Sequence, residues 1–131
     1  MIHEISISTK RKTEFIDITS EVNEIVRKEN VQEGVCVVFC PHTTAGLVIN
    51  ENADFSVRKD IISSLQRLIP EDEVYSHLEG NSPAHIKSSI LGNSLTVFIE
   101  NKKLKLGTWQ GIFFCEFDGP RNRKVWVKIL K

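Results

Sequence analysis

The chain has 131 residues, a length that predicts a single domain covering residues 1–131. Its 17 Lys and Arg residues balance 17 Asp and Glu residues, so it lacks the basic surplus that proteins use to bind nucleic-acid phosphates. No apolar run reaches the roughly 18 residues of a membrane-spanning helix, and the N-terminus lacks the features of a signal peptide. We therefore expect a soluble, cytoplasmic protein with reduced cysteines and no nucleic-acid or membrane partner.

The first third of the chain alternates strand and helix patterns. Residues 2–8 and 15–18 have the alternation of strands, and the basic turn between them predicts a β-hairpin. Thr19 or Ser20 is expected to cap a helix that follows. The apolar run 35–40 predicts a buried central strand. Cys36 and Cys40 lie about 13 Å apart on such a strand, too far for a disulfide or a shared zinc ion, so Cys36 is interpreted as a core residue.

A polar turn, residues 41–46, follows the central strand. It offers the imidazole of His42 and the hydroxyls of Thr43 and Thr44. Such a turn can present hydroxyl and backbone N–H groups to an anion. A plain polar connection to the next strand, residues 47–49, explains the same residues.

The longest predicted helix covers residues 55–69. Asp54 is expected to cap it and Pro70 to end it. Its apolar stripe is expected to face the core. Arg58, Lys59 and Arg67 are assigned to its solvated face.

Residues 75–85 form an unusually polar segment that contains His77, Glu79, Asn81 and His85. Ser82 is a suitable N-cap and Pro83 a suitable first helical residue, so residues 83–91 are predicted to form a short helix with His85 in its first turn. Polar loops in small domains frequently carry function. A surface loop with two solvated histidines is the alternative.

Three strands are predicted for the remainder, at residues 94–100, 108–117 and 121–130. In the second of these, Glu116 shares a face with apolar residues, so its carboxylate needs a cation, a metal or a hydrogen-bond donor. Arg121 and Arg123 begin the last strand on one side, where two guanidinium groups suit a phosphate or carboxylate. A solvated basic edge that discourages strand pairing is the alternative.

Together these elements predict a compact two-layer α+β domain, with a largely antiparallel or mixed sheet, two main helices and one short helix. His42, His77 and His85 are expected in loops or at element ends, and three imidazoles with an open fourth position are a known catalytic zinc arrangement. Glu79, Asn81 and Glu116 are candidates to orient these imidazoles. An anionic substrate would bind to Thr43, Thr44, Arg121 and Arg123.

Four sequence blocks resemble the YjbQ-like family, also called the secondary thiamine-phosphate synthase family. They are residues 40–46, 49–54, 77–85, and 107–110 followed by 116–121. The resemblance covers nearly the whole chain. One departure is Phe55, where the family often has a proline after the aspartate.

The resemblance implies a homotrimer with a metal-linked polar site in or near the subunit interface. His42, His77 and His85 match the metal positions, with Glu79, Asn81 and Glu116 nearby as catalytic candidates. Zinc is the expected metal, with magnesium as an alternative for a diphosphate substrate. The implied reaction joins an aminopyrimidine methyl diphosphate to a thiazole phosphate, giving thiamine phosphate and diphosphate. Arg121, Arg123 and the cation would stabilise the leaving diphosphate.

Two other functions remain open at this level. One is a metal-dependent phosphohydrolase, in which Glu116 or Glu79 activates a metal-bound water. The other is a non-catalytic trimeric protein that binds a metal or a phosphorylated metabolite, which predicts ligand-dependent stabilisation without turnover.

Overall fold

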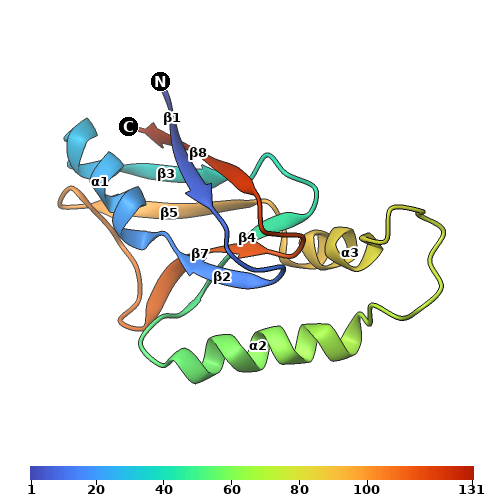
Figure 1. The fold of residues 1–131 in the computed structure, drawn as a ribbon. Helices are drawn as coiled ribbons and strands as arrows, with labels where there is room; N and C mark the ends of the chain where they lie inside the picture. Colours follow the sequence, from blue (N-terminus) through green and yellow to red (C-terminus); the bar gives the residue numbers. More distant parts are fainter.

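The computed structural model describes all 131 residues as eight strands and three helices (Figure 1). In chain order these are β1 (Ile2–Ser8), β2 (Glu14–Asp17), α1 (Thr19–Glu29), β3 (Glu33–Phe39), β4 (Ala45–Glu51), α2 (Phe55–Leu68), α3 (Ser82–Leu91), β5 (Ser94–Glu100), β6 (Lys103–Leu104), β7 (Gln110–Glu116) and β8 (Asn122–Leu130). The predicted α+β class is confirmed.

The strands divide between two antiparallel sheets. One has the order β1-β8-β3-β5-β6 and the other the order β2-β7-β4. The predicted hairpin of residues 2–8 and 15–18 is therefore wrong, because β1 pairs with β8 while β2 pairs with β7. The turn between them bonds instead to the β7–β8 connection, through Thr9 N to Arg121 O (2.9 Å) and Gly119 N to Lys12 O (3.0 Å). It thereby carries the chain from one sheet to the other.

The main core includes residues from both sheets and from α1. Strand β3 is central in its sheet, as predicted, and its Cys36 and Val38 are fully buried. Val22 and Val26 of α1 belong to the same cluster. On the opposite side of β3, Val35 and Val37 are half-buried and Phe39 is exposed, so the side chains of the apolar run 35–40 lie on both faces of the sheet.

Strand β7 separates this core from a second, smaller one. Its alternate residues Ile112 and Phe114 enter the main core, whereas Phe113 and Cys115 join the second cluster, which includes Ala84 of α3. The period-two prediction for this strand is therefore confirmed. Because every side chain from Ile112 to Glu116 is buried, β7 fixes the depth at which Glu116 lies.

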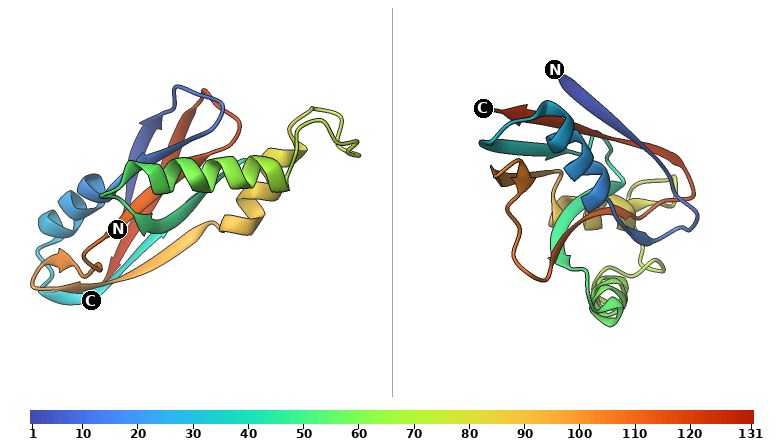
Figure 2. Two further views of the ribbon diagram at one scale, coloured as in Figure 1. Left: turned by 90° about the horizontal axis from the view of Figure 1, so that it is seen from below. Right: turned by 90° about the vertical axis from the view of Figure 1, so that its left-hand side faces the viewer.

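Helix α2 lies along the outside of the smaller sheet (Figures 1 and 2). Asp54 caps it as predicted, accepting a hydrogen bond from Ser56 N at 2.9 Å. No residue of α2 is fully buried, and Leu68 is exposed. The solvated position predicted for Arg58 is wrong, because its guanidinium lies 4.4 Å from the centre of the Phe113 ring. A planar cation over an aromatic face explains this placement.

Two predicted helix caps are shifted. Helix α1 begins at Thr19, one residue after the N-cap Ile18, and the Asp17 carboxylate accepts the hydrogen bond from Thr19 N. Ser82 lies inside α3, and Asn81 takes the N-cap position. At α1 the Asp17 carboxylate takes over part of the capping role, whereas Asn81 makes no side-chain capping hydrogen bond at α3. Both helices nevertheless lie where the pattern places them, within one or two residues.

The end of α3 is fixed closely to the β3–β4 region. Leu47 N donates to Gly92 O at 3.1 Å, and Cys40 N donates to Asn93 O at 2.7 Å. Gly46 permits this approach, since a Cβ there would lie 2.8 Å from Gly92 O. This contact brings the polar turn 41–44 next to α3.

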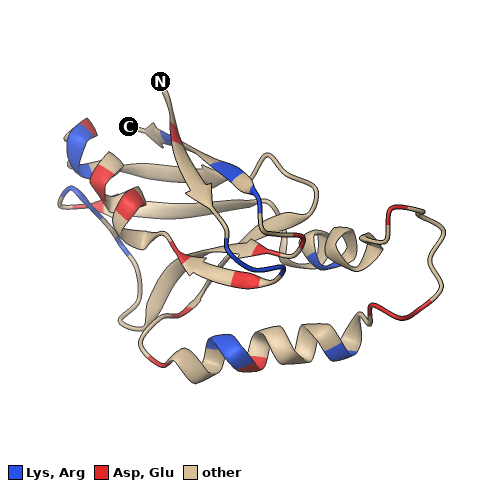
Figure 3. Ribbon diagram, viewed as in Figure 1, with Lys and Arg blue, Asp and Glu red and all other residues tan.

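The connection between α2 and α3 projects away from the two sheets (Figures 1 and 2). It carries His77 and Glu79, both exposed. Basic and acidic residues are interspersed over the fold (Figure 3). None of the three helices is both long and apolar enough to cross a membrane.

Candidate functional site

Four chain segments meet at one polar pocket of about 460 Å³, here called the histidine pocket. Its lining contains every predicted site residue except Glu116: Pro41, His42, Thr43, Thr44, His77, Glu79, Asn81, His85, Arg121 and Arg123. The segments are the β3–β4 turn, the α2–α3 connection, the start of α3 and the start of β8. Residues far apart in the sequence are thus brought together, and none of the lining side chains is hydrophobic.

Glu116 lies directly beneath the pocket in a buried ion pair with Arg123. The Glu116 side chain is 0% exposed and that of Arg123 5% exposed. Arg123 Nε donates to Glu116 Oε1 at 2.8 Å, and Nη2 donates to Oε2. We expected a cation, a metal or a hydrogen-bond donor beside Glu116, and the structure places an arginine there. A pair of this geometry shares two parallel hydrogen bonds, which makes it rigid.

Further donors complete the network around this pair. Thr9 Oγ1 donates to Glu116 Oε1 at 2.8 Å, and Asp118 N donates to Oε2 at 3.0 Å. Arg123 also donates to Thr44 Oγ1 at 2.9 Å. Burial alone would raise the pKa of Glu116, but the hydrogen bonds from Arg123, Asp118 and Thr9 outweigh it and hold that pKa below its usual range. Glu116 is thus a carboxylate whose two oxygens are already engaged, and it can act as a base only if this network opens.

Arg121 and Arg123 have different surroundings, although both line the pocket. Arg121 is exposed and donates from Nη2 to Asp118 Oδ2 at 2.8 Å. The same carboxylate oxygen accepts from Asn81 Nδ2 at 3.0 Å. Because Arg123 is buried, the alternative of a solvated basic edge is wrong for that residue. Arg121 keeps unused N–H groups at the pocket surface.

His42 is held in place by the backbone of β8. Its Nε2 accepts a hydrogen bond from Lys124 N at 3.0 Å, and its ring meets the Phe114 ring edge-on at 6.4 Å. Burial, followed by the positive charge of Arg123, lowers the pKa of His42. With Nε2 acting as acceptor, the neutral ring carries its hydrogen on Nδ1. His42 is therefore a neutral imidazole with one N–H to offer.

His77 and His85 form a second imidazole group. Their ring centres lie 5.4 Å apart at an interplanar angle of 89°. Glu79 approaches His77 to 3.9 Å, beyond hydrogen-bonding distance. Asn81 Oδ1 is buried at the edge of this group and has no hydrogen-bond partner. His77 and His85 thus line the pocket without a close hydrogen-bond partner for their rings.

The geometry does not fit a three-histidine zinc site within one chain. No three His, Cys, Asp or Glu side chains lie close enough to hold a metal ion. One nitrogen of His42 is committed to Lys124, so this ring cannot coordinate through Nε2 as it stands. The three cysteines are buried and none of them lines the pocket. Zinc binding by the three histidines stays a prediction.

Sequence reasoning missed two residues that organise the pocket, Thr9 and Asp118. Thr9 is 4% exposed and links Glu116 to the backbone of Arg121, whose N–H donates to Thr9 Oγ1 at 2.8 Å. Asp118 joins Asn81 to Arg121. Thr9 directly follows β1 and lies 107 residues before Glu116 in the sequence. No local sequence pattern therefore connects it to the site. Asp118 lies in a turn motif that is common in loops.

Comparison with known proteins gives a consistent result. The family model described as "UPF0047 protein YjbQ-like" matches residues 3–131. UPF0047 protein MJ1081 of Methanocaldococcus jannaschii is 52% identical over 130 residues, covering 99% of this chain and 94% of that protein. UPF0047 protein YugU of Bacillus subtilis is 47% identical and covers 99% of both chains.

Solved structures agree with this likeness. An uncharacterised YjbQ/UPF0047 family protein from Clostridium acetobutylicum is 56% identical and superposes with a TM-score of 0.96, over 98% of this chain and 99% of that one. A protein of unknown function from Sulfolobus solfataricus is 34% identical, with a TM-score of 0.95 over 99% and 96% of the two chains. Neither description assigns an activity.

The buried pair beneath the pocket makes a testable prediction. Glu116→Gln leaves Arg123 buried without a counter-charge, and is expected to lower the free energy of unfolding at pH 7 by about 3–5 kcal/mol. The double variant Glu116→Gln, Arg123→Met should lose less than the sum of the two single variants. Urea denaturation measures all three, and additive losses would contradict the coupling.

The buried pair also predicts how the stability of the chain depends on pH. The pKa of Glu116 is lower in the folded chain than in the unfolded chain, so its ionised side chain stabilises the fold above the ordinary glutamate pKa of about 4.3. This contribution to the free energy of unfolding is lost as the pH falls further. The wild type should therefore lose stability on acidification below about pH 4 more steeply than Glu116→Gln.

Proposed function

The chain belongs to the UPF0047 YjbQ-like family, and from this premise we propose that its histidine pocket binds a phosphorylated metabolite and catalyses transfer at a diphosphate ester. The observation that carries the proposal is the convergence of three histidines, two threonines and two arginines from distant segments on one pocket without hydrophobic lining. Phosphate oxygens accept several hydrogen bonds at once, and such a set of donors matches them.

Each donor has a defined place in this proposal. Arg121 is exposed at the rim and keeps N–H groups beyond those that Asp118 uses. Thr43 offers an exposed hydroxyl, while Thr44 is turned towards Arg123. His42 adds a neutral N–H. Arg123 and Glu116 neutralise each other, so the pair holds the floor of the pocket in place and contributes little net charge.

The reaction that we propose is the one implied by the family resemblance. The thiazole nitrogen would form a C–N bond to the methylene carbon of an aminopyrimidine methyl diphosphate as the C–O bond to the diphosphate breaks. The electron pair leaves with the diphosphate oxygen, and no proton needs to be removed. Arg121 and the histidine donors would stabilise the charge that develops on the leaving group. Magnesium would arrive as part of the diphosphate substrate.

A binding function without catalysis is the second candidate. The donors that line the pocket are enough to hold an anion without any bond being broken. Glu116 has both carboxylate oxygens engaged, which leaves Glu79, an exposed residue, as the only lining carboxylate. The same observation weakens the phosphohydrolase alternative, which needs a free base next to an activated water.

We also propose that the chain assembles as the homotrimer implied by the resemblance, through the outer face of the larger sheet. Val35 is paired with both Phe98 and Leu130, and Phe39 stacks on Trp126 at 6.0 Å. Phe98 is 67% exposed. Apolar residues gathered on one sheet face are typical of a contact surface.

The proposed activity is tested by mixing both thiamine precursors with the wild-type chain, either treated with chelator and given magnesium or supplied with zinc. Thiamine phosphate and diphosphate formed in equal amounts support the transferase. Inorganic phosphate released from one precursor alone would support the phosphohydrolase. Binding of inorganic pyrophosphate with neither product would favour the binding protein.

Arg121→Ala is expected to weaken the binding of inorganic pyrophosphate at least tenfold, since a hydrogen bond to a charged group contributes about 1.5–3 kcal/mol. Isothermal titration calorimetry measures the change. Arg27→Ala is the matched control, because Arg27 also pairs with a carboxylate three residues away but lies on α1. Equal losses in the two variants, or no loss in Arg121→Ala, would contradict the assignment.

For the assembly, the wild type should have three times the chain mass of 14.9 kDa in light scattering. Phe98→Glu with Trp126→Glu should reduce this to a single chain, because charges on the sheet face oppose its burial. Leu68→Glu, which alters an exposed leucine of α2, should remain trimeric. Dissociation of Leu68→Glu alone would place the contact on α2 instead.

A further inference from the structure

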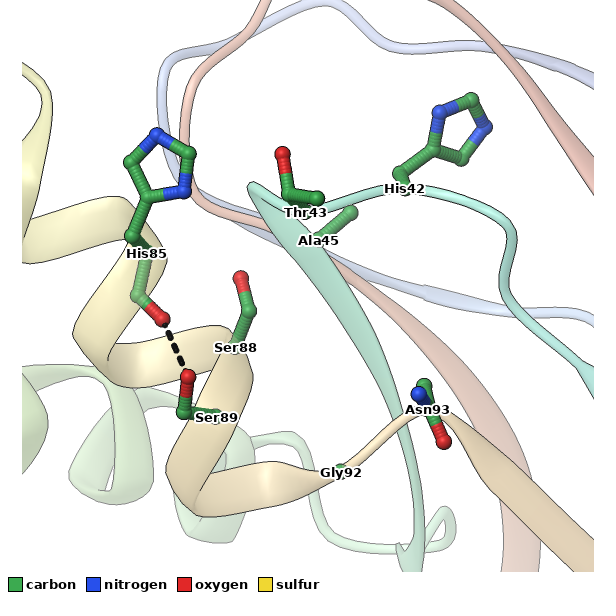
Figure 4. A pocket seen from close by; sticks show the side chains of 8 residues that line it. All are labelled: His42, Thr43, Ala45, His85, Ser88, Ser89, Gly92 and Asn93. Atoms are coloured by element: carbon green, nitrogen blue, oxygen red, sulfur yellow. Dashed lines mark hydrogen bonds between the residues drawn. The ribbon is translucent and has the colours of Figure 1, made fainter.

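A second cavity, of about 470 Å³, adjoins the histidine pocket and is shown in Figure 4. It lies between the β3–β4 turn and the C-terminal half of α3, and we call it the serine pocket after Ser88 and Ser89. His42, Thr43 and His85 line both cavities. A molecule bound in one can therefore extend past these shared residues into the other.

The serine pocket differs from its neighbour in charge. Apart from the two shared histidines, none of its lining side chains can ionise. Lysine, arginine and carboxylate groups are all missing from this wall. The cavity therefore suits an uncharged group, whereas the histidine pocket carries the arginines.

The hydroxyls of the serine pocket have a fixed polarity. Ser88 Oγ donates to Ala84 O at 2.7 Å, and Ser89 Oγ donates to His85 O at 2.8 Å (Figure 4). Each hydroxyl has thereby used its only hydrogen and presents lone pairs. Asn93 adds an exposed amide, which can both donate and accept. A group that meets the two serines must therefore carry hydrogen-bond donors.

The wall that carries these groups is held rigidly. Asn93 O accepts from Cys40 N, and Gly92 O accepts from Leu47 N. Gly46 lies too close to Gly92 O for any side chain to separate them. A cavity backed by paired backbone changes little when a ligand binds, so its side chains are positioned in advance.

We propose that the serine pocket is a specificity subsite, which binds the uncharged, donor-bearing part of the substrate whose phosphate group occupies the histidine pocket. This inference rests on the proposed function. The chemical class is a phosphorylated molecule with hydroxyl or ring amino groups, such as a sugar phosphate or an amino-substituted heterocycle on a phosphate ester. Ser89 and Asn93 determine this preference, and Ser88 supports the wall from its buried position.

Calorimetric titration with three probes tests the subsite. Methyl phosphate supplies a phosphate alone, ribose 5-phosphate adds hydroxyls, and cytidine 5′-monophosphate adds a ring amino group. The wild type is expected to bind at least one of the larger probes about tenfold more tightly than methyl phosphate, as two further hydrogen bonds would allow. The double variant Ser89→Ala, Asn93→Ala should bind that probe within about twofold of methyl phosphate, with its methyl phosphate affinity unchanged.

Ser63→Ala, on the exposed side of α2, is the control and should behave as the wild type. Equal affinity of the wild type for all three probes overturns the subsite while leaving the phosphate site intact. Loss of methyl phosphate affinity in the double variant, in step with the larger probe, also overturns it. If no probe binds the wild type, the proposed function fails and the subsite fails with it.

Discussion

The ion pair between Glu116 and Arg123 is the constraint on which the site depends. Burying two charges is favourable only when their geometry is good and their remaining hydrogen-bonding groups are satisfied. Here Thr9, Thr44 and the backbone of Asp118 complete the pair. These partners come from the end of β1, the β3–β4 turn and the β7–β8 connection. Satisfying one buried pair therefore fixes, relative to one another, the segments that form the floor of the histidine pocket.

The pocket combines this rigid floor with a more exposed rim. His42 is held by the backbone of Lys124, and α3 is fixed to β3 and β4 through Gly92 and Asn93. His77, in contrast, lies in the α2–α3 connection, which projects away from the sheets (Figure 1). A rigid floor lowers the cost of ordering on binding, while an exposed rim admits the ligand. The adjoining serine pocket extends the rigid part, so discrimination between substrates would depend on it.

Much of the fold follows from local patterns in the sequence. Apolar periodicity and capping residues placed β3 at the centre of its sheet, α2 after Asp54 and the alternating faces of β7. The β1–β2 hairpin failed because alternation tells which face of a strand is buried and not which strand is its partner. For the site, the chemistry of the side chains identified residues that the structure brings together around the histidine pocket. It missed Thr9 and Asp118, whose roles come from tertiary contacts. It also could not give the distances between the histidines, which decide whether a metal ion fits.

The most direct test of this account is to map where a phosphate group binds. A ¹⁵N-labelled, chelator-treated chain would be titrated with inorganic pyrophosphate, and the backbone and histidine side-chain resonances would be followed by NMR. The account predicts that the largest shifts fall on Thr43, His42, His85 and Arg121, with little change on the outer face of the larger sheet. Saturable shifts confined to other surfaces, or no shifts until zinc is added, would contradict a phosphate site built from these side chains alone.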